Sequence, residues 1–186
     1  MTELKVNAGE MRLLSGRLFN FITPDPALID INDIAAGLAY KAHFSGQIPN
    51  FFSIAEHSTL CVDLLPKNSP ALLKLTTLLH DASEAYLGDM IKPLKIMMPD
   101  FGKIEAVLQK AIFLKFDAAP DYLFIDLMHR VKLVDKESQV IEYNCFYNSA
   151  IDARLKFYSP DLSKWVFIKY FNDIMAELKL NDNGNY

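Results

Sequence analysis

The sequence predicts an all-α fold, a bundle of helices. Apolar residues recur every three or four positions from residue 31 onward, and several segments begin with helix-capping signals. No pair of segments shows the two-residue alternation of half-buried strands. With 186 residues, 51% of them hydrophobic and 23% charged, the chain has the length and composition of one ordinary globular domain. We therefore expect a single helical domain over residues 1–186.

The first part of the chain is expected to be irregular. Glycines at positions 9 and 16 and prolines at 24 and 26 interrupt residues 1–30, which leaves room for one short extended piece. A half-buried helix should follow, because Ile31, Ile34 and Leu38 recur at helical spacing.

The next two helices have recognisable starts. Ser53 and Glu56 form a capping box, in which the serine caps the helix and the glutamate reaches back to it, so a helix is expected from about 53 to 65. Ser69 and Pro70 then begin a strongly apolar segment, predicted as one central buried helix over 71–86. Further helices are expected over about 102–116, 121–150 and from 160, with a polar, frayed tail over 181–186.

Charge and cysteine content narrow the function. The net charge of −4 argues against a protein that coats nucleic acid, although a small anionic ligand needs only a local basic pocket. Cys61 and Cys145 stand far apart in apolar surroundings, as free thiols in a reducing compartment do. There is no signal peptide and no apolar run long enough to cross a membrane. We expect a cytoplasmic protein without a membrane partner.

One apolar segment carries an unusual group of polar residues. His80, Asp81 and Glu84 lie within the predicted central helix, where buried polar groups are costly unless they are paired or bind a metal. A satisfied structural pair is the alternative for an isolated His-Asp dipeptide. His57 on the preceding helix and Asp135 within a later apolar helix could add a second imidazole and a second carboxylate. Such a set leaves room for water and substrate at the metal.

The spacing His57, His80-Asp81, Asp135 resembles the signature of the HD-domain metal-dependent phosphohydrolases. The likeness is closer to one subgroup, the YfbR-like 5′-deoxynucleotidases and the phage DatZ-like dATP triphosphohydrolases. It extends over roughly residues 12 to 145 and is carried by the segments SGRLF (15–19), DIA (33–35), FSG (44–46), FSIAEHS (52–58), LHDASEAYLGD (79–89) and PLK (93–95). It implies an HD-domain helical bundle.

The resemblance also implies roles for individual residues. The expected metal ligands are His57, His80, Asp81 and Asp135, holding a divalent ion such as Co, Mn, Zn or Fe, with Mg²⁺ as the ion expected on the phosphates. Glu84 matches the residue that orients or activates the attacking water, and Asp89 matches an acidic residue near the sugar or leaving group.

Five further residues are expected around the substrate. Lys95 and Lys92 would face phosphate oxygens, Arg17 matches an arginine at the substrate mouth, and Phe19 and Phe21 are candidate base-stacking surfaces. The alternative for the lysines is a solvated basic face, and for the phenylalanines the core. His43 occupies the position before FSG where related sequences often carry an arginine, and we interpret it as structural.

The resemblance therefore predicts a metal-dependent hydrolase of deoxynucleotides. Release of triphosphate from dATP or a related dNTP is the first hypothesis, and removal of a 5′-monophosphate is the alternative. A third hypothesis is a nucleotide sensor without catalysis; hydrolysis of (p)ppGpp is disfavoured because Ala85, and not an aspartate, follows Glu84. Members of the subgroup tend to be oligomers, so a dimer or hexamer is expected. The expected location is the cytoplasm, which for a phage-encoded protein is that of the host.

Overall fold

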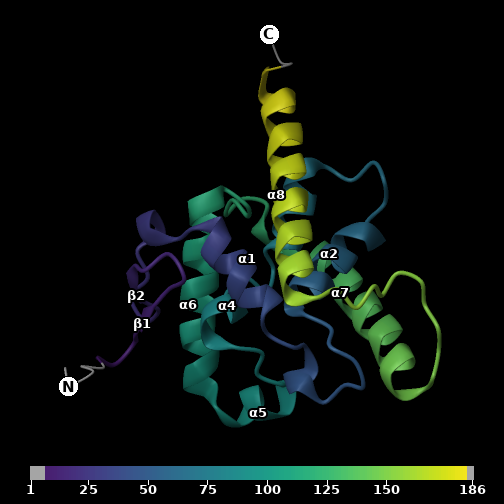
Figure 1. The fold of residues 1–186 in the computed structure, drawn as a ribbon. Helices are drawn as coiled ribbons and strands as arrows, with labels where there is room; N and C mark the ends of the chain where they lie inside the picture. The colour runs from purple at the N-terminus through teal and green to yellow at the C-terminus, as the bar shows by residue number, and fades with distance from the viewer. Residues whose placement is uncertain (1–6, 184–186) are drawn as a thin grey trace.

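The computed structural model describes residues 7–183 and confirms the predicted all-α fold (Figure 1). The helices are α1 (Ile31–Ala39), α2 (Ile54–Leu64), α3 (Ala71–Leu78), α4 (Glu84–Leu87), α5 (Lys92–Met97), α6 (Pro99–Phe116), α7 (Phe124–Tyr147) and α8 (Pro160–Asn183). Single 3-10 turns, η1 (Pro26–Leu28) and η2 (Phe44–Gly46), flank α1.

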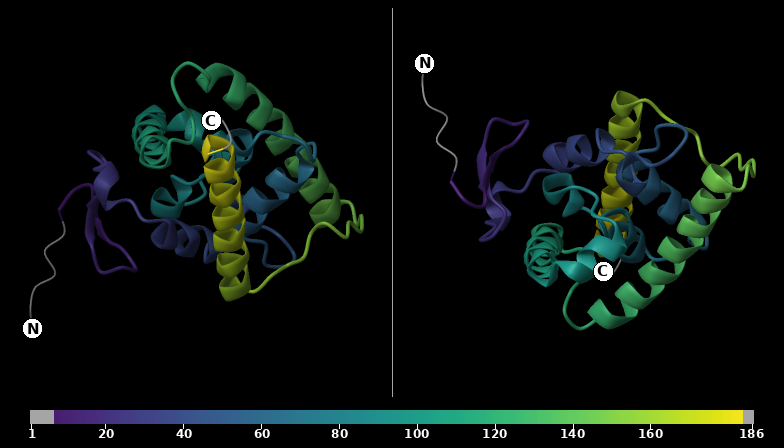
Figure 2. Two further views of the ribbon diagram at one scale, coloured as in Figure 1. Left: turned by 90° about the horizontal axis from the view of Figure 1, so that it is seen from above. Right: turned by 90° about the horizontal axis from the view of Figure 1, so that it is seen from below.

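Helix α8 is the element around which the bundle is arranged. It packs against α1, α2 and α3, and Figures 1 and 2 show α6 and α7 on either side of it. The main apolar core joins side chains of these helices, among them Ile34, Leu75, Leu108 and Phe167, each without exposed surface. A second apolar cluster lies between α2, α3 and α7. The helices α2 and α7 are therefore held side by side, which brings residues 57 and 135 within reach of each other.

The N-terminal segment is more regular than predicted. Strands β1 (Glu10–Arg12) and β2 (Leu18–Asn20) form an antiparallel hairpin, with Met11 opposite Phe19, where one extended piece was expected. Strands of three residues are too short to show alternation in a sequence. Gly16 turns the chain between them with a φ of +82°, a conformation that favours glycine. The hairpin lies at the edge of the bundle (Figure 2).

The predicted central helix over 71–86 is wrong, because the chain turns between α3 and α4. Between residues 80 and 86 the backbone forms i to i−3 hydrogen bonds in place of a helical ladder, with the amides of His80, Ala82, Glu84, Ala85 and Tyr86 as donors. Gln109 of α6 supplies two further partners: its amide nitrogen donates to the Leu79 carbonyl at 2.7 Å, and its oxygen accepts from the Ser83 amide at 3.0 Å. The turn is stable because Gln109 provides hydrogen-bond partners for backbone groups that a helix would otherwise pair.

The capping box is confirmed only in part. The Ser53 hydroxyl accepts from the Glu56 amide at 3.1 Å, as a cap does. The Glu56 carboxylate does not complete the box. It is buried and accepts from the amides of Lys156, Phe157 and Tyr158 at 2.7–2.9 Å. Glu56 thus fixes the start of α2 to the loop that precedes α8.

Both ends of the chain lie partly outside the described residues. Helix α8 includes positions 181–183, while 184–186 lie outside the described part of the chain, as do 1–6 of the expected irregular segment. Among residues 7–183, no helix combines the length and the apolar character needed to cross a membrane.

We predict that Glu56→Gln lowers the free energy of unfolding by about 2–3 kcal/mol, because an amide NH₂ group would face one of the loop amides and leave two buried donors opposed. Urea unfolding followed by circular dichroism measures the change. Glu137→Gln, at an exposed position of α7, is the matched control and should alter stability by about 0.5 kcal/mol or less. Equal midpoints for the two variants would contradict the role given to Glu56.

Candidate metal centre

The structure brings together the four side chains that the sequence singled out as metal ligands. His57 of α2 has its Nε2 atom 3.6 Å from Asp81 Oδ2 and 3.4 Å from Asp135 Oδ1 of α7. His80 Nε2 lies 3.2 Å from Asp81 Oδ2 and 3.9 Å from Asp135 Oδ1. His80 and Asp81 lie in the turn between α3 and α4. Adjacent residues of a helix would point about 100° apart.

Both imidazoles are oriented by hydrogen bonds at the opposite ring atom. His80 Nδ1 lies 2.7 Å from the Thr77 carbonyl, which can only accept, so this nitrogen carries the proton. His57 Nδ1 lies 2.7 Å from Glu142 Oε1 and donates to that carboxylate. In the neutral imidazole the lone pair is then on Nε2, the atom of each ring that faces the two aspartates. This is the tautomer that a metal ligand requires.

Glu142 is itself held by neighbours on two sides. The Ser138 hydroxyl, one turn earlier on α7, donates to Glu142 Oε1 at 2.5 Å. His43 Nδ1 lies 3.1 Å from Glu142 Oε2, and the rings of His43 and His57 are 4.4 Å apart. Burial alone would raise the pKa of Glu142, but His57 and His43 hold it well below the usual range. Glu142 is therefore an anion within the core.

The electrostatic field at the centre favours positive charge. Burial would lower the pKa of His57 and His80, yet Cys61 and Glu142 next to His57, and Asp81 and Asp135 next to His80, raise both pKa values well above normal. Against the effect of burial, the imidazoles lower the pKa of Asp81 to about 2 and that of Asp135 further. A divalent cation would satisfy the same charges without the protons.

The cluster fits a metal ion on a second ground. His80 Nε2 is buried and has no hydrogen-bond partner, an uncommon state for a polar atom in a folded protein. Ligand atoms of His57, Cys61, His80 and Asp135 all lie within 4.8 Å of one another. The chain thus has buried histidine, cysteine and aspartate side chains that could hold a metal ion. The side chains of Asp81 and Asp135 are 29% and 25% exposed and those of the histidines 6% or less, so the centre opens on its carboxylate side.

Glu84 lies beside this centre on α4. Its Oε1 accepts from Lys95 Nζ at 3.2 Å, while its Oε2 is buried and unpaired. Burial, with added repulsion from Asp81, raises the pKa of Glu84 to about 8. Lys95 lies near the centre as expected, but it also donates to Glu105 Oε1 of α6 at 2.6 Å, so two carboxylates already neutralise it.

Asp89 lies at the rim of the site. Its Oδ2 accepts from the Ser45 amide at 3.0 Å, and its carbonyl accepts from the Ser45 hydroxyl, which ties η2 to the chain after α4. Asp89 also contributes to the raised pKa of Glu84, so the two carboxylates face a common region.

The other expected substrate residues differ in their surroundings. The expectation that Phe19 is a base-stacking surface is corrected. Its side chain is fully buried and stacks on Tyr86 with ring centroids 4.8 Å apart, so it has no free face for a base. Phe21 is half-buried against the core. Arg17 lies next to β2, with Nη2 3.5 Å from Asp30 Oδ2. Lys92 is exposed at the start of α5.

Sequence reasoning missed Glu142 and the part that His43 plays. His43 is buried, as a structural residue should be, but it contacts both Glu142 and a proposed ligand. A signal for Glu142 existed in α7, where the buried stripe of Val131 and Val134 continues at helical spacing into Ser138 and Glu142. Two polar residues on an apolar stripe indicate a buried partner, which here is His57.

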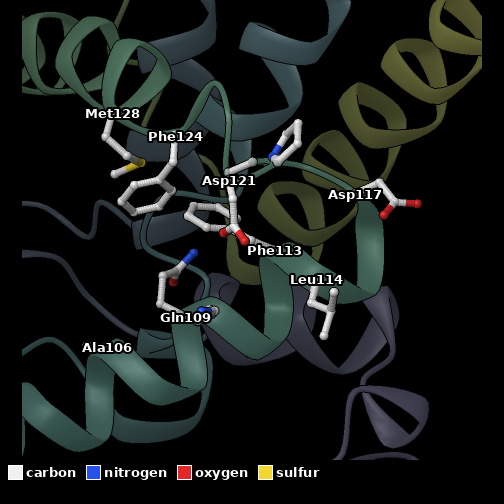
Figure 3. Close-up of a pocket in the computed structure, with 11 residues that line it drawn as sticks. Ala106, Gln109, Phe113, Leu114, Asp117, Asp121, Phe124 and Met128 are labelled. Atoms are coloured by element: carbon white, nitrogen blue, oxygen red, sulfur yellow. The ribbon is translucent and has the colours of Figure 1, made fainter.

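A cavity of about 540 Å³ lies between α6 and the start of α7 (Figure 3). Phe113, Phe124 and Met128 supply much of its apolar wall, and Gln109 is among its lining residues. None of the four proposed ligands lines it. Gln109 therefore separates this cavity from the turn that carries His80 and Asp81.

Comparison with known proteins shows that the chain has relatives of similar sequence. It is 36% identical over 137 residues to the uncharacterized protein RCAP_rcc00048 of Rhodobacter capsulatus, a match that covers 70% of this chain and 69% of that protein. The chain belongs to the family of RCAP_rcc00048. It is also 34% identical over 110 residues to the uncharacterized protein YfdR of Escherichia coli strain K12, covering 59% of this chain and 60% of YfdR. No family model matches the chain.

We predict that Glu142→Gln weakens binding of a divalent ion by about 10- to 100-fold, because the amide no longer fixes the His57 tautomer as a carboxylate does. Competition with a fluorescent chelator measures the affinity. Glu137→Gln on the same helix is the control and should bind like the wild type. An unchanged affinity in the Glu142 variant would show that His57 does not need this partner.

Proposed function

We propose that the protein is a metal-dependent deoxynucleotide phosphohydrolase of the HD-domain type. The observation that carries the proposal is the convergence of His57, His80, Asp81 and Asp135, with both Nε2 atoms freed by hydrogen bonds at Nδ1. Its preferred reaction, on the strength of the sequence resemblance, is release of triphosphate from a dNTP such as dATP.

The positive charge that offsets the phosphates would come from a cation held by the four ligands. When bound, a divalent ion supplies a Lewis acid for phosphoryl oxygens and makes water a stronger acid. A net charge of −4 is compatible with phosphate binding, because few basic side chains are then needed. The open carboxylate side of the centre gives a ligand access.

Glu84 is proposed as the group that takes the proton of the attacking water. Its free Oε2 is buried next to the centre, and Lys95 holds Oε1, so the carboxylate has one orientation and one available oxygen. The water oxygen forms a bond to the α-phosphorus while one water proton passes to Glu84, the bond from phosphorus to the sugar O5′ breaks, and O5′ takes up a proton from solvent. Lys95 offsets charge on the phosphates once substrate competes with its present partners.

Activity is tested on a panel of dNTPs and dNMPs with Mn²⁺, Co²⁺, Mg²⁺ or Zn²⁺, with the products identified. We predict inorganic triphosphate and deoxynucleoside from a dNTP, and loss of both metal binding and turnover in His80→Ala and Asp81→Ala. His129→Ala, exposed on α7, is the control. Orthophosphate from dNMPs alone would indicate the 5′-deoxynucleotidase reaction. No hydrolysis by metal-loaded protein would leave the sensor hypothesis.

Glu84→Gln separates metal binding from turnover. We predict that it keeps the metal and lowers kcat by about 100-fold or more, because the amide cannot accept a proton. In the wild type, kcat should rise with pH as Glu84 loses its proton, with a midpoint below 8 since a bound cation lowers the pKa from that value. Asp100→Asn, exposed on α6, is the control. Full activity in Glu84→Gln would exclude this residue as the base.

The homo-oligomeric state and the cytoplasmic location stay predictions of the sequence. They are independent of the chemistry proposed for the metal centre.

A further inference from the structure

Cys61 is a buried thiol next to the proposed ligands. It lies one helical turn after His57 on α2 and has no exposed surface. Its Sγ is 3.7 Å from His57 Nε2, the same atom that faces Asp81 and Asp135. The resemblance gave it no role, and the hydrolytic steps above do not use it.

The distances fit a ligand that shares one ion with His57. With metal–nitrogen and metal–sulfur bonds of about 2.1 and 2.3 Å, two ligands of a tetrahedral ion lie about 3.6 Å apart. The separation of 3.7 Å between Sγ and Nε2 agrees with that value. The corresponding separation between His57 Nε2 and Asp135 Oδ1 is 3.4 Å, again close to a tetrahedral edge.

A second observation is independent of the cysteine. His80 Nε2 is buried without a hydrogen-bond partner, in a side chain only 6% exposed, and it belongs to the same group of atoms within 4.8 Å. A buried nitrogen lone pair without a partner indicates a ligand at this point, and a bound ion would satisfy it.

We propose that Cys61 is a thiolate ligand of the metal ion in addition to His57, His80, Asp81 and Asp135, and that it makes the centre prefer Zn²⁺ or Co²⁺ to Mg²⁺ or Mn²⁺. On binding, the Sγ–metal bond replaces the S–H bond, and the proton passes to solvent. Thiolate ligands favour softer ions, whereas carboxylates and water suit Mg²⁺ and Mn²⁺. Asp81, 29% exposed, then lies on the open side. The inference rests on the metal centre of the proposed function and not on hydrolysis.

The second cysteine provides a matched control. Cys145 of α7 is half-buried against the apolar cluster that contains Phe52 and Phe146, and it is outside the candidate ligand group. A Cys→Ser change at either position alters the same atom, but only position 61 adjoins His57.

The test is optical spectroscopy of Co²⁺-loaded protein. We expect a near-ultraviolet thiolate-to-cobalt charge-transfer band in the wild type and Cys145→Ser, and its loss in Cys61→Ser. Visible d–d bands should persist in Cys61→Ser, with Co²⁺ and Zn²⁺ bound about tenfold or more weakly and Mn²⁺ affected less.

The outcomes separate the two proposals. Wild-type d–d bands without a charge-transfer band would overturn the role of Cys61 and leave the metal centre intact. No Co²⁺ binding at all would overturn both. If Cys61→Ser does not fold, X-ray absorption at the cobalt edge of the wild type decides the matter: a sulfur neighbour at about 2.3 Å supports the inference. Only nitrogen and oxygen neighbours would overturn it.

Discussion

The hydrogen bond between His57 and Glu142 is the interaction on which the centre depends. At 2.7 Å, between two side chains without exposed surface, it places a charge-assisted bond between α2 and α7. It fixes the ring of His57 and so the direction in which Nε2 points. Because the two helices also meet through an apolar cluster, their packing and the orientation of the ring are set together. Removing Glu142 would leave the Nδ1–H group of a buried imidazole without its charged partner.

Much of the fold followed from periodicity and capping. Helices α1, α2, α6, α7 and α8 correspond to predicted segments, since each is long enough to show a three- to four-residue apolar repeat. The hairpin and α5 were not predicted, because segments of three to six residues are too short to show a periodic apolar pattern. The break after α3 was hidden because its stability comes from Gln109, thirty residues later than the Leu79 carbonyl that it contacts. Such contacts cannot be seen in a local pattern.

The candidate metal centre, like the fold, was predicted only in part. The convergence of His57, His80-Asp81 and Asp135 was predicted, because each is a polar residue in an apolar segment with a recognisable spacing. The surrounding shell was not, since the partnership of Glu142 with His43 joins positions 99 residues apart through tertiary packing alone. Phe19 shows the converse error: aromatic character suggested a binding surface, whereas the side chain is fully buried in the main core.

The exposure of Asp81 and Asp135 on the open side of the centre has a consequence for the order of assembly. An anion that approaches the empty cluster meets two carboxylates first and is repelled. Once a cation is seated, the same entrance becomes attractive. Under the proposed function, the cation would therefore bind first and an anionic ligand second. An anionic ligand would then distinguish the metal-loaded protein from the metal-free protein by charge alone.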